Sequence, residues 1–484
     1  MTRYYKNLFV FCKLFATTCF LLPSFVATLL SIRTRHALVL LRSVILVSYN
    51  AFTRIRAESL LNSRLTLERA FFKMLYKKIA KNRTYTLAAN AEETYRKYGH
   101  LAATEQFIKL AQIEIEERSQ ILGDDTLLFG PGWVSAFGHI SNLSLFPKIH
   151  RLGWRSSSKL LIAGGRPANS AMLDLYKNWY HILSLDSNTQ VFFDLCFQDI
   201  YQNMNAIEIK RNLVTDLYSA QFEIEEEIRK QFGESFHLLE VPNTVNEVGR
   251  QYLETHNLDP ESWFVTLHMR ETGDVGKYKG GDDVNPATYT EAINTILDLG
   301  GQIIRIGDNS MTSLNALGVR SKRVLDYAKV EAKNPQLDVY FLGACRYMIG
   351  TGSGPITFPN EFGRPVLYTN VPAIGRTLRL RGVSTPQLLR NRRSGKLLTL
   401  REMLDCPLAW NVSPSTLEID RVANSSDDIV SGVMELQALT EPNQSGFWKS
   451  SNVRCLNSTK FSNWKIGVPL VDSFLQKYPE VFYD

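Results

Sequence analysis

The chain has 484 residues, of which 44% are hydrophobic and 21% are charged. These values are ordinary for folded soluble protein, and they exclude a disordered chain, a collagen-like fibre and a polytopic membrane protein. The length exceeds what one hydrophobic core usually supports, so we expect two or three domains.

The net charge of +7 lies entirely at the N-terminus. Residues 1–60 hold eight basic residues and one acid, Glu58, while residues 61–484 hold 47 basic and 47 acidic residues. The body of the protein is therefore neutral. This distribution gives no sign of a general nucleic-acid-binding surface, and we expect no nucleic acid among the partners.

An uncharged stretch from Leu14 to Ile32 is just long enough to cross a bilayer as a helix. The larger basic cluster follows this stretch, which favours a cytoplasmic body, and we expect residues 8–53 to contact the membrane. Two alternatives stay open. One is an arm that rests on the membrane; the other is a lumenal enzyme, which would suit the six Asn-x-Ser/Thr triplets at Asn82, Asn142, Asn411, Asn424, Asn443 and Asn457.

Residues 57–122 have helical composition, with no proline and one internal glycine, Gly99. One weak hairpin of tetratricopeptide type and a plain helical connector both fit this region. The six cysteines of the chain are too few and too scattered for a disulfide scaffold, so we expect buried or free thiols.

From Asp124 onward, short β-rich runs alternate with helical stretches, which predicts parallel sheets covered by helices. The expected strands lie in TLLFG, KLLIAGG (159–165), VFFDLCF (191–197), FHLLEVP (236–242), WFVTLHMR (263–270), GQIIRIGD (301–308), RVLDYA, YMIGTG and PVLYTN (365–370). A break near 257–262 divides this series into two Rossmann-like domains that face a cleft, where ligands sit beyond the carboxyl ends of the strands.

The segment WFVTLHMRETGDVGKYKGGDDVN carries the most candidate site residues. Its apolar strand ends in His268 and Arg270, and a glycine-rich polar loop follows. Arginine offers a fixed fork of donors to phosphate oxygens, and glycines allow backbone N–H groups to approach the same anion. A structural ion pair between Arg270 and a nearby carboxylate is the alternative.

The segment MIGTGSGPITFPNEF predicts a second anion site. Its strand ends at Ile349, and Pro355 is expected to open a helix after Thr351, Ser353 and Gly354. A tight structural turn is the alternative. Neither this segment nor the loop at Lys277 matches a dinucleotide fingerprint or a P-loop.

A third segment, IIRIGDNSM, places Gly307 at the end of a strand and Asp308 after it. Asp308 can cap the next helix or bind a ligand hydroxyl, and the sequence does not decide between these roles. The chain has no D-x-D, G-x-S-x-G or H-E-x-x-H motif and no histidine cluster at metal spacing. We therefore expect no metal and no cofactor.

The order of LHMRETG, PATYTEAINTILDLGGQIIRIGDNSM, LDVYFLGACRYMIGTGSGPITFPNEFGRPVLYTN and GKLLTLREML resembles a family of bacterial glycosyltransferases. That family is distantly similar to the fucosyltransferases with an H-x-R motif. The resemblance covers about residues 127–484 and implies a GT-B-like fold and transfer of a sugar from a nucleotide donor.

By this resemblance Arg270 holds the donor diphosphate and His268 lies near the donor. The residues after Arg270 depart from the fucosyltransferase pattern, which argues against GDP-fucose as the donor. Arg270 and the helix start at Ser353 and Gly354 would stabilise the leaving diphosphate, and Glu271 or Asp274 would deprotonate the acceptor hydroxyl. The expected donor site comprises His268, Arg270, Lys279, Gly307, Asp308, Thr351, Ser353 and Gly354.

We thus expect a membrane-associated, metal-independent glycosyltransferase of hexosyl or fucosyl type that acts on a polysaccharide, glycolipid or protein acceptor. The alternative is a non-catalytic, membrane-anchored scaffold with a degenerate transferase domain. The expected divisions are a membrane segment (1–56), a helical region (57–122), two Rossmann-like domains (123–258 and 259–410) and C-terminal helices that pack back (411–484).

Overall fold

The computed structural model describes residues 126–129, 131–154, 159–163, 167–183, 206–210, 213–271, 283–371, 381–405, 418–441 and 468–483. The expected membrane segment, the helical region, the strand at 191–197 and five of the six cysteines lie outside these ranges. In the part of the chain that is described, no helix is both long enough and apolar enough to cross a membrane. Cys345 is buried and its thiol is free, as expected.

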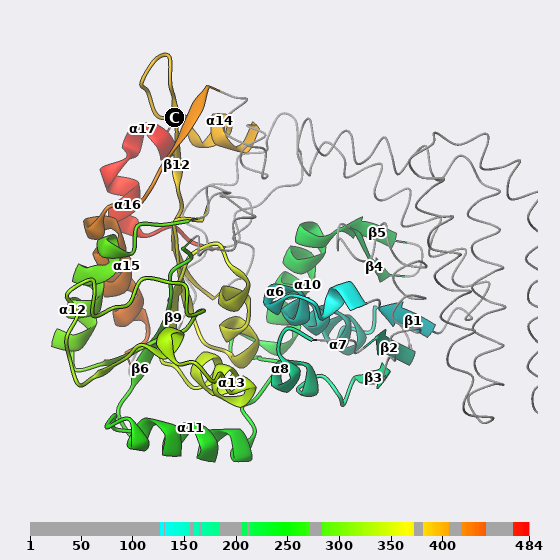
Figure 1. Cartoon of the computed structure of the whole chain (residues 1–484). Helices are drawn as coiled ribbons and strands as arrows, with labels where there is room; N and C mark the ends of the chain where they lie inside the picture. The colour runs from blue at the N-terminus through cyan, green and yellow to red at the C-terminus, as the bar shows by residue number, and fades with distance from the viewer. Residues whose placement is uncertain are drawn as a thin grey trace, which may run out of the picture.

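The first half of the described chain contains a parallel three-stranded sheet and an antiparallel hairpin (Figure 1). The sheet has the order β1 (Thr126–Phe129), β2 (Lys159–Ala163), β3 (Tyr180–Leu183), and the hairpin pairs β4 (Ala206–Lys210) with β5 (Leu213–Asp216). The helical elements are η1 (Pro131–Trp133), α6 (Phe137–Ser141), η2 (Asn142–Ser144), α7 (Leu145–Arg151), α8 (Ser170–Asp174) and α10 (Leu217–Phe232).

The second half is built on a six-stranded sheet in which every pairing is parallel. Its order is β11 (Gly382–Thr385), β10 (Val366–Thr369), β9 (Tyr347–Gly350), β6 (Phe264–His268), β7 (Gln302–Arg305), β8 (Val324–Leu325). Numbered along the chain, this is the 3-2-1-4-5-6 order of a Rossmann fold, and the order reverses between β6 and β9. The predicted α/β fold with parallel sheets is confirmed.

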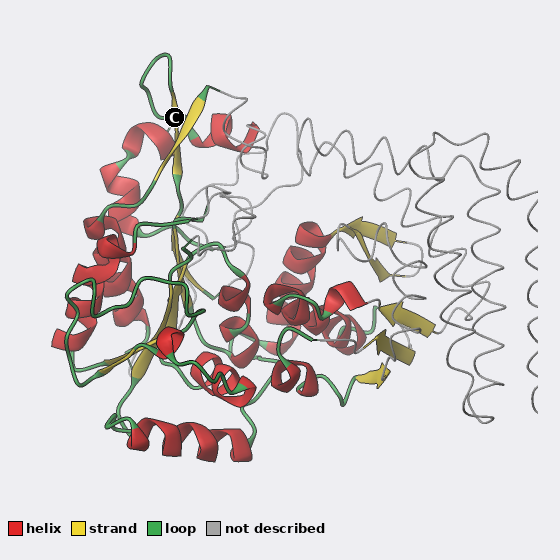
Figure 2. Cartoon of the chain, in the orientation of Figure 1, coloured by secondary structure: helices red, strands yellow, loops and turns green. Residues whose placement is uncertain are grey.

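Both faces of this sheet are buried, which explains why its strands are nearly continuous apolar runs. Phe264, Ile304, Met348 and Val366 face the cluster covered by α11 (Asn243–Thr255), α13 (Pro335–Gly343) and the first half. The intervening residues face the second cluster, which is covered by α12 (Thr290–Asp298), α15 (Ser426–Leu439), α16 (Asp472–Lys477) and α17 (Pro479–Phe482). Figure 2 shows helices on both sides of these strands.

Local sequence fixes where the covering helices begin. The Asn334 side chain accepts a hydrogen bond from the Gln336 amide at 2.9 Å, and Pro335 occupies the first turn of α13. Ser425 and Asp428 form a capping box at the start of α15. The remaining elements are η3 (Pro286–Tyr289), η4 (Tyr327–Lys329), η5 (Gly354–Thr357), η6 (Pro359–Phe362), β12 (Leu388–Asn391), α14 (Leu400–Asp405) and β13 (Ile419–Val422).

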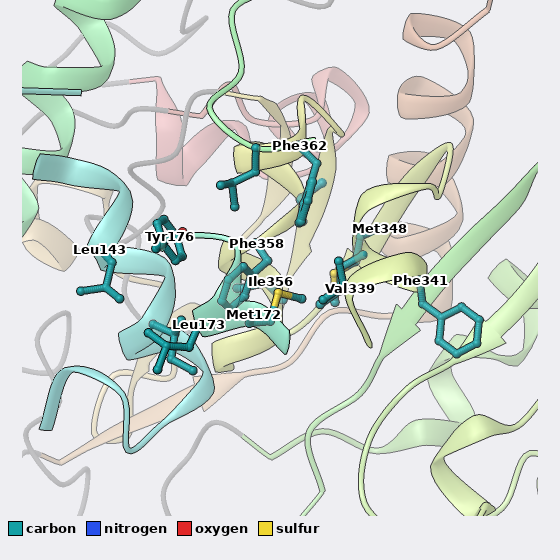
Figure 3. Packing of buried hydrophobic residues seen from close by; sticks show 14 of the residues in the cluster. Leu143, Met172, Leu173, Tyr176, Val339, Phe341, Met348, Ile356, Phe358 and Phe362 are labelled. Carbon is teal, nitrogen blue, oxygen red and sulfur yellow. The ribbon is translucent and has the colours of Figure 1, made fainter. Parts of the chain in front are cut away.

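The two halves share one hydrophobic core. Figure 3 shows Leu143, Met172, Leu173 and Tyr176 of the first half together with Ile356, Phe358 and Phe362 of the second. Phe137 of α6 packs edge-on against Phe358, with ring centroids 5.0 Å apart. Residues far apart in the sequence therefore form a single apolar junction.

A buried ion network lies in the same junction. The Lys148 ammonium contacts Glu225 of α10 and lies 2.7 Å from Glu361 Oε2 of η6. Ser144 donates to Glu361 Oε1 at 2.9 Å. Burial acts to lower the pKa of Lys148, but the two carboxylates outweigh it and raise the pKa above its ordinary value.

Two predicted elements are wrong. FHLLEVP (236–242) is an extended connector and not a strand, because the Leu238 and Leu239 amides donate to the Glu361 carbonyl at 3.2 and 2.9 Å and not to a neighbouring strand. The helix expected to open at Pro355 is two short 3₁₀ turns, η5 and η6. In addition, α11 lies before the expected boundary at residue 258 but packs against α13 of the second half.

Two of the six Asn-x-Ser/Thr triplets lie among the described residues, and both asparagines are buried. Asn142 accepts a hydrogen bond from Gln221 at 2.7 Å, and Asn424 bonds the backbone of Asn370 and Pro386. A glycan on either side chain would have to displace the residues that bury it. The other four triplets lie outside the described ranges.

Candidate functional site

Two of the predicted site segments meet where the strand order of the second sheet reverses. His268 at the end of β6 is paired with Gly350 at the end of β9. Beyond the strands, the Thr351 amide donates to the His268 carbonyl at 3.3 Å, and the Arg270 amide donates to Thr351 Oγ1 at 3.0 Å. The carboxyl ends of parallel strands at such a reversal form the ligand crevice in open α/β sheets.

The Arg270 side chain lies at this edge of the sheet and is 31% exposed. Its Nη1 donates to the Gly352 carbonyl at 3.3 Å, and its Nε lies 3.6 Å from Asp283 Oδ1. The carboxylate partner considered as the alternative is therefore present. The ion pair is long and half-exposed, so the guanidinium also faces solvent, where an anion can approach.

His268 is buried beside Arg270 and has one ring nitrogen without a partner. Its Nδ1 lies 3.4 Å from the Ile306 carbonyl, while Nε2 has no hydrogen-bond partner among the described residues. Burial lowers the pKa of His268 to about 4, and the charges of Arg305 and Arg270 act in the same direction. The ring is neutral at pH 7, and because a carbonyl can only accept, Nδ1 carries the hydrogen and Nε2 is an acceptor.

Gly307 and Asp308 form the next strand exit, after β7. Gly307 has a φ of +150° and lies against Met311, so a side chain there would clash. Asp308 caps a turn and not a helix, because Ser310 donates its amide to Oδ1 at 2.8 Å and the described residues between β7 and β8 form only turns. Partial burial acts to raise the pKa of Asp308, but the bonds from Ser310 outweigh it and lower the pKa.

Three predicted donor ligands follow β9, and each has different neighbours: Thr351, Ser353 and Gly354. Thr351 is fully buried and bonds the Arg270 amide, so it joins the two strand exits. Gly354 packs against Gly138 of α6, where a Cβ on Gly354 would lie 2.6 Å from the Gly138 amide nitrogen. This close backbone approach explains the glycine by itself. Ser353 precedes a 3₁₀ turn of four residues, which is too short to give a helix dipole.

Both carboxylate oxygens of Glu271 accept hydrogen bonds from the protein. Oε1 lies 2.6 Å from Arg305 Nη2, and Oε2 accepts from the Thr312 amide at 2.9 Å. Arg305 is completely buried and was not among the predicted site residues. The only signal in the sequence was a charged residue inside the apolar run IIRIG. The other predicted base, Asp274, and the predicted donor ligand Lys279 lie outside the described residues.

No group of three or more His, Cys, Asp or Glu side chains suitable for a metal ion occurs within the described ranges.

No protein-family model matches the chain, and no curated protein matches it. Among solved structures, the chain is similar to ADP-heptose lipopolysaccharide heptosyltransferase II of E. coli, with 12% identity over 55% of this chain and 90% of that one and a TM-score of 0.33. A family 9 glycosyl transferase from Veillonella parvula is 10% identical over 47% of this chain and 61% of that one, with a TM-score of 0.24. At these TM-scores the two likenesses establish neither the fold nor the activity of the chain.

Proposed function

We propose that the protein is a glycosyltransferase that binds a nucleotide-sugar donor at the exits of β6 and β9. The observation that carries this proposal is the neutral Nε2 of His268, which has no partner among the described residues, next to Arg270 where the strand order reverses. Such an acceptor can take a hydrogen bond from a ligand hydroxyl or N–H group, and a guanidinium suits phosphate oxygens. A nucleotide sugar carries both kinds of group.

In the proposed reaction, the bond between the sugar and the diphosphate breaks as the acceptor hydroxyl attacks the sugar carbon. Negative charge then develops on the leaving diphosphate, and Arg270 stabilises it. The sequence has no D-x-D pair, so we assign this role to a cationic side chain instead of a metal. Asp274 remains the candidate base for the acceptor hydroxyl, and Lys279 a candidate donor ligand.

The acceptor and the location are further parts of the proposal. A GT-B-like arrangement would bring the acceptor from the side of the first half, whose α6 touches η5 at the Gly138–Gly354 contact. The basic residues that flank Leu14 to Ile32 support membrane attachment with a cytoplasmic body. A polysaccharide, glycolipid or protein acceptor at the membrane is consistent with that location.

The experiment is a transfer assay with the full chain in detergent or lipid. UDP-, GDP-, ADP- and CDP-sugars are supplied in turn with membrane extract as acceptor, and the released nucleoside diphosphate is quantified. We expect release from one nucleotide class, and a loss of about 100-fold or more in Arg270→Ala, since a charge that stabilises the transition state is removed. Release that is equal in wild type and Arg270→Ala would disprove the site.

A non-catalytic scaffold is the second candidate, and the ion pair of Arg270 with Asp283 favours it, because a protein carboxylate already neutralises part of the guanidinium charge. The same assay separates the two. A scaffold with a degenerate site would release no nucleoside diphosphate from any donor, and none of the four nucleoside diphosphates would raise its Tm.

A further inference from the structure

A buried guanidinium connects three neighbouring strand exits of the second sheet. Arg305 ends β7, Glu271 follows β6, and Asp326 follows β8. Arg305 Nη2 lies 2.6 Å from Glu271 Oε1, and Arg305 Nη1 lies 3.4 Å from Asp326 Oδ1 and donates to the Thr312 carbonyl. The side chain of Arg305 is fully buried, so water does not compete for these contacts.

The two carboxylates also hold the backbone of the loop that follows β7. Glu271 Oε2 accepts from the Thr312 amide at 2.9 Å, and Asp326 Oδ2 accepts from the Leu314 amide at 2.8 Å. These contacts therefore fix the exit of β6 against the loop that begins at Gly307 and Asp308. Because Arg270 directly precedes Glu271, the same contacts hold its backbone in place.

We propose that Glu271 and Arg305 are positioning residues that hold Arg270 and the loop 307–314 in the geometry that binds the donor diphosphate. This inference rests on the proposed function and assigns Glu271 a different role from the base expected from the sequence. A base must direct an oxygen at the acceptor hydroxyl, whereas both oxygens of Glu271 are bound by Arg305 and Thr312. Ligand groups held by packed, hydrogen-bonded neighbours keep their geometry more closely than unsupported ones.

The test measures the Kd of the full chain for UDP, GDP, ADP and CDP by titration calorimetry. For the nucleoside diphosphate that wild type binds, Glu271→Ala and Arg305→Lys should each weaken binding about tenfold, by analogy with other supporting residues. Glu271→Gln keeps an acceptor for Arg305 and should recover most of the affinity. In the Arg270→Ala background, Glu271→Ala should add less than the roughly tenfold loss that it causes in wild type, since part of its effect acts through Arg270.

Arg346 and Glu441 provide a matched control, because this ion pair has an N–O distance of 2.8 Å but lies at the amino end of β9. Glu441→Ala should leave the Kd unchanged.

Measuring kcat against pH distinguishes a positioning role of Glu271 from base catalysis. Loss of a general base lowers kcat by about 10²- to 10⁴-fold and changes the pH profile. Glu271→Ala should instead keep the pH profile and lose no more than about tenfold in kcat at saturating donor, since Arg270 is displaced but still present.

A second readout needs no ligand. Amide hydrogen exchange at residues 307–314 should be faster in Glu271→Ala and Arg305→Lys than in wild type, and unchanged in Glu441→Ala. Unchanged exchange in this loop overturns the inference, as does a Kd that Glu271→Ala leaves at the wild-type value. If the loop exchanges faster but wild type binds none of the four nucleotides, the positioning contacts are real and it is the proposed function that fails.

Discussion

The buried His268 makes the stability of the folded protein depend on pH. The folded pKa is about 4, against an ordinary value of 6.5, so the folded ring stays neutral where the unfolded ring becomes charged. As the pH falls from 6.5 toward 4, the unfolded chain therefore takes up a proton that the folded chain does not, and the free energy of unfolding decreases. The sign follows from proton linkage, and the contribution of His268 to stability is greatest above pH 6.5.

His268→Gln should remove this dependence. The difference between 6.5 and 4 corresponds to about 3 kcal/mol lost on acidification, so the variant should lose about 2 to 3 kcal/mol less than wild type between pH 7 and pH 4. Urea unfolding at the two pH values gives the comparison, and other titrating groups cancel because both proteins contain them. Equal losses in the two proteins would show that His268 is not buried in its neutral form.

The close approach of Gly354 to Gly138 predicts that a side chain at position 354 would destabilise the fold. An alanine Cβ there would lie 2.6 Å from the Gly138 nitrogen and 3.2 Å from its Cα, and backbone atoms cannot rotate away. Gly354→Ala should therefore lower the free energy of unfolding by about 1 to 3 kcal/mol and lower the Tm.

Gly395→Ala is the comparison for this variant, because a Cβ on Gly395 would meet nothing within 4 Å and its φ of +70° is the only source of strain. We expect a cost of about 1 kcal/mol there. Urea unfolding of both variants gives the comparison. If Gly354→Ala lowers the free energy of unfolding by less than Gly395→Ala does, the Gly138–Gly354 contact is not as close as described.

At the scale of elements, the Lys148 network connects α7, α10 and η6. Lys148→Met would remove the buried ammonium that contacts Glu225 and lies 2.7 Å from Glu361, and we expect a loss of about 3 to 5 kcal/mol in the free energy of unfolding. Lys230→Met is the control, since Lys230 is 59% exposed and lies 3.5 Å from Glu226; its cost should stay below about 1 kcal/mol. Similar values for the two variants would contradict a buried network.

A second contact between elements responds to pH in the opposite sense to His268. Asn169 of α8 donates to Asp338 Oδ2 of α13 at 2.9 Å, and burial raises the pKa of Asp338 to about 6. The folded state holds this proton more tightly than the unfolded state, so the contribution of Asp338 is greatest below pH 3.8 and is lost as the pH rises through 6.

Asp338→Asn keeps an oxygen that can accept from Asn169 and removes the titration. The variant should be about 1 to 3 kcal/mol more stable than wild type at pH 7.5, and this advantage should shrink as the pH falls to 4. Denaturant unfolding at both pH values measures the trend. An advantage that grows on acidification would reverse the sign and disprove the raised pKa.

The sequence predicts most of the elements that build the second sheet, because both of its faces are buried and its strands read as apolar runs. Chain order and the parallel arrangement then bring Arg270 and Thr351 to one edge. The roles of Glu271 and Gly354 were not predictable in this way. Glu271 depends on Arg305, 34 positions later, and Gly354 depends on a backbone contact with Gly138, so neighbouring residues carry no sign of either.

The apolar segment 236–242 shows why composition alone misassigned one strand. Its residues bury side chains such as Leu239 against the shared core, as a strand would. The Leu238 and Leu239 amides, however, both donate to the carbonyl of Glu361, and no strand of the described chain pairs with this segment. The apolar residues of a segment indicate that it is buried, but they do not indicate which backbone groups its amides will bond.

At the scale of the whole molecule, the described chain combines two halves that share one core, with the candidate site at the carboxyl edge of the second sheet. The excess positive charge belongs to residues 1–60, so any attraction to anionic membranes is separated in sequence from Arg270. When the protein is mixed with lipid vesicles, donor binding should consequently not depend on their lipid composition. Attachment of the protein to the vesicles should increase with their content of anionic lipid.

Hydrogen exchange with and without a nucleoside diphosphate tests the location of the site most directly. With the nucleotide that raises the Tm of wild type, amides in 268–271 and 350–354 should exchange several-fold more slowly, since both strand exits contact the ligand. The exposed hairpin residues 390–396 should not change. Slower exchange confined to other segments, with 268–271 and 350–354 unaffected, would contradict a donor site at the reversal of the strand order.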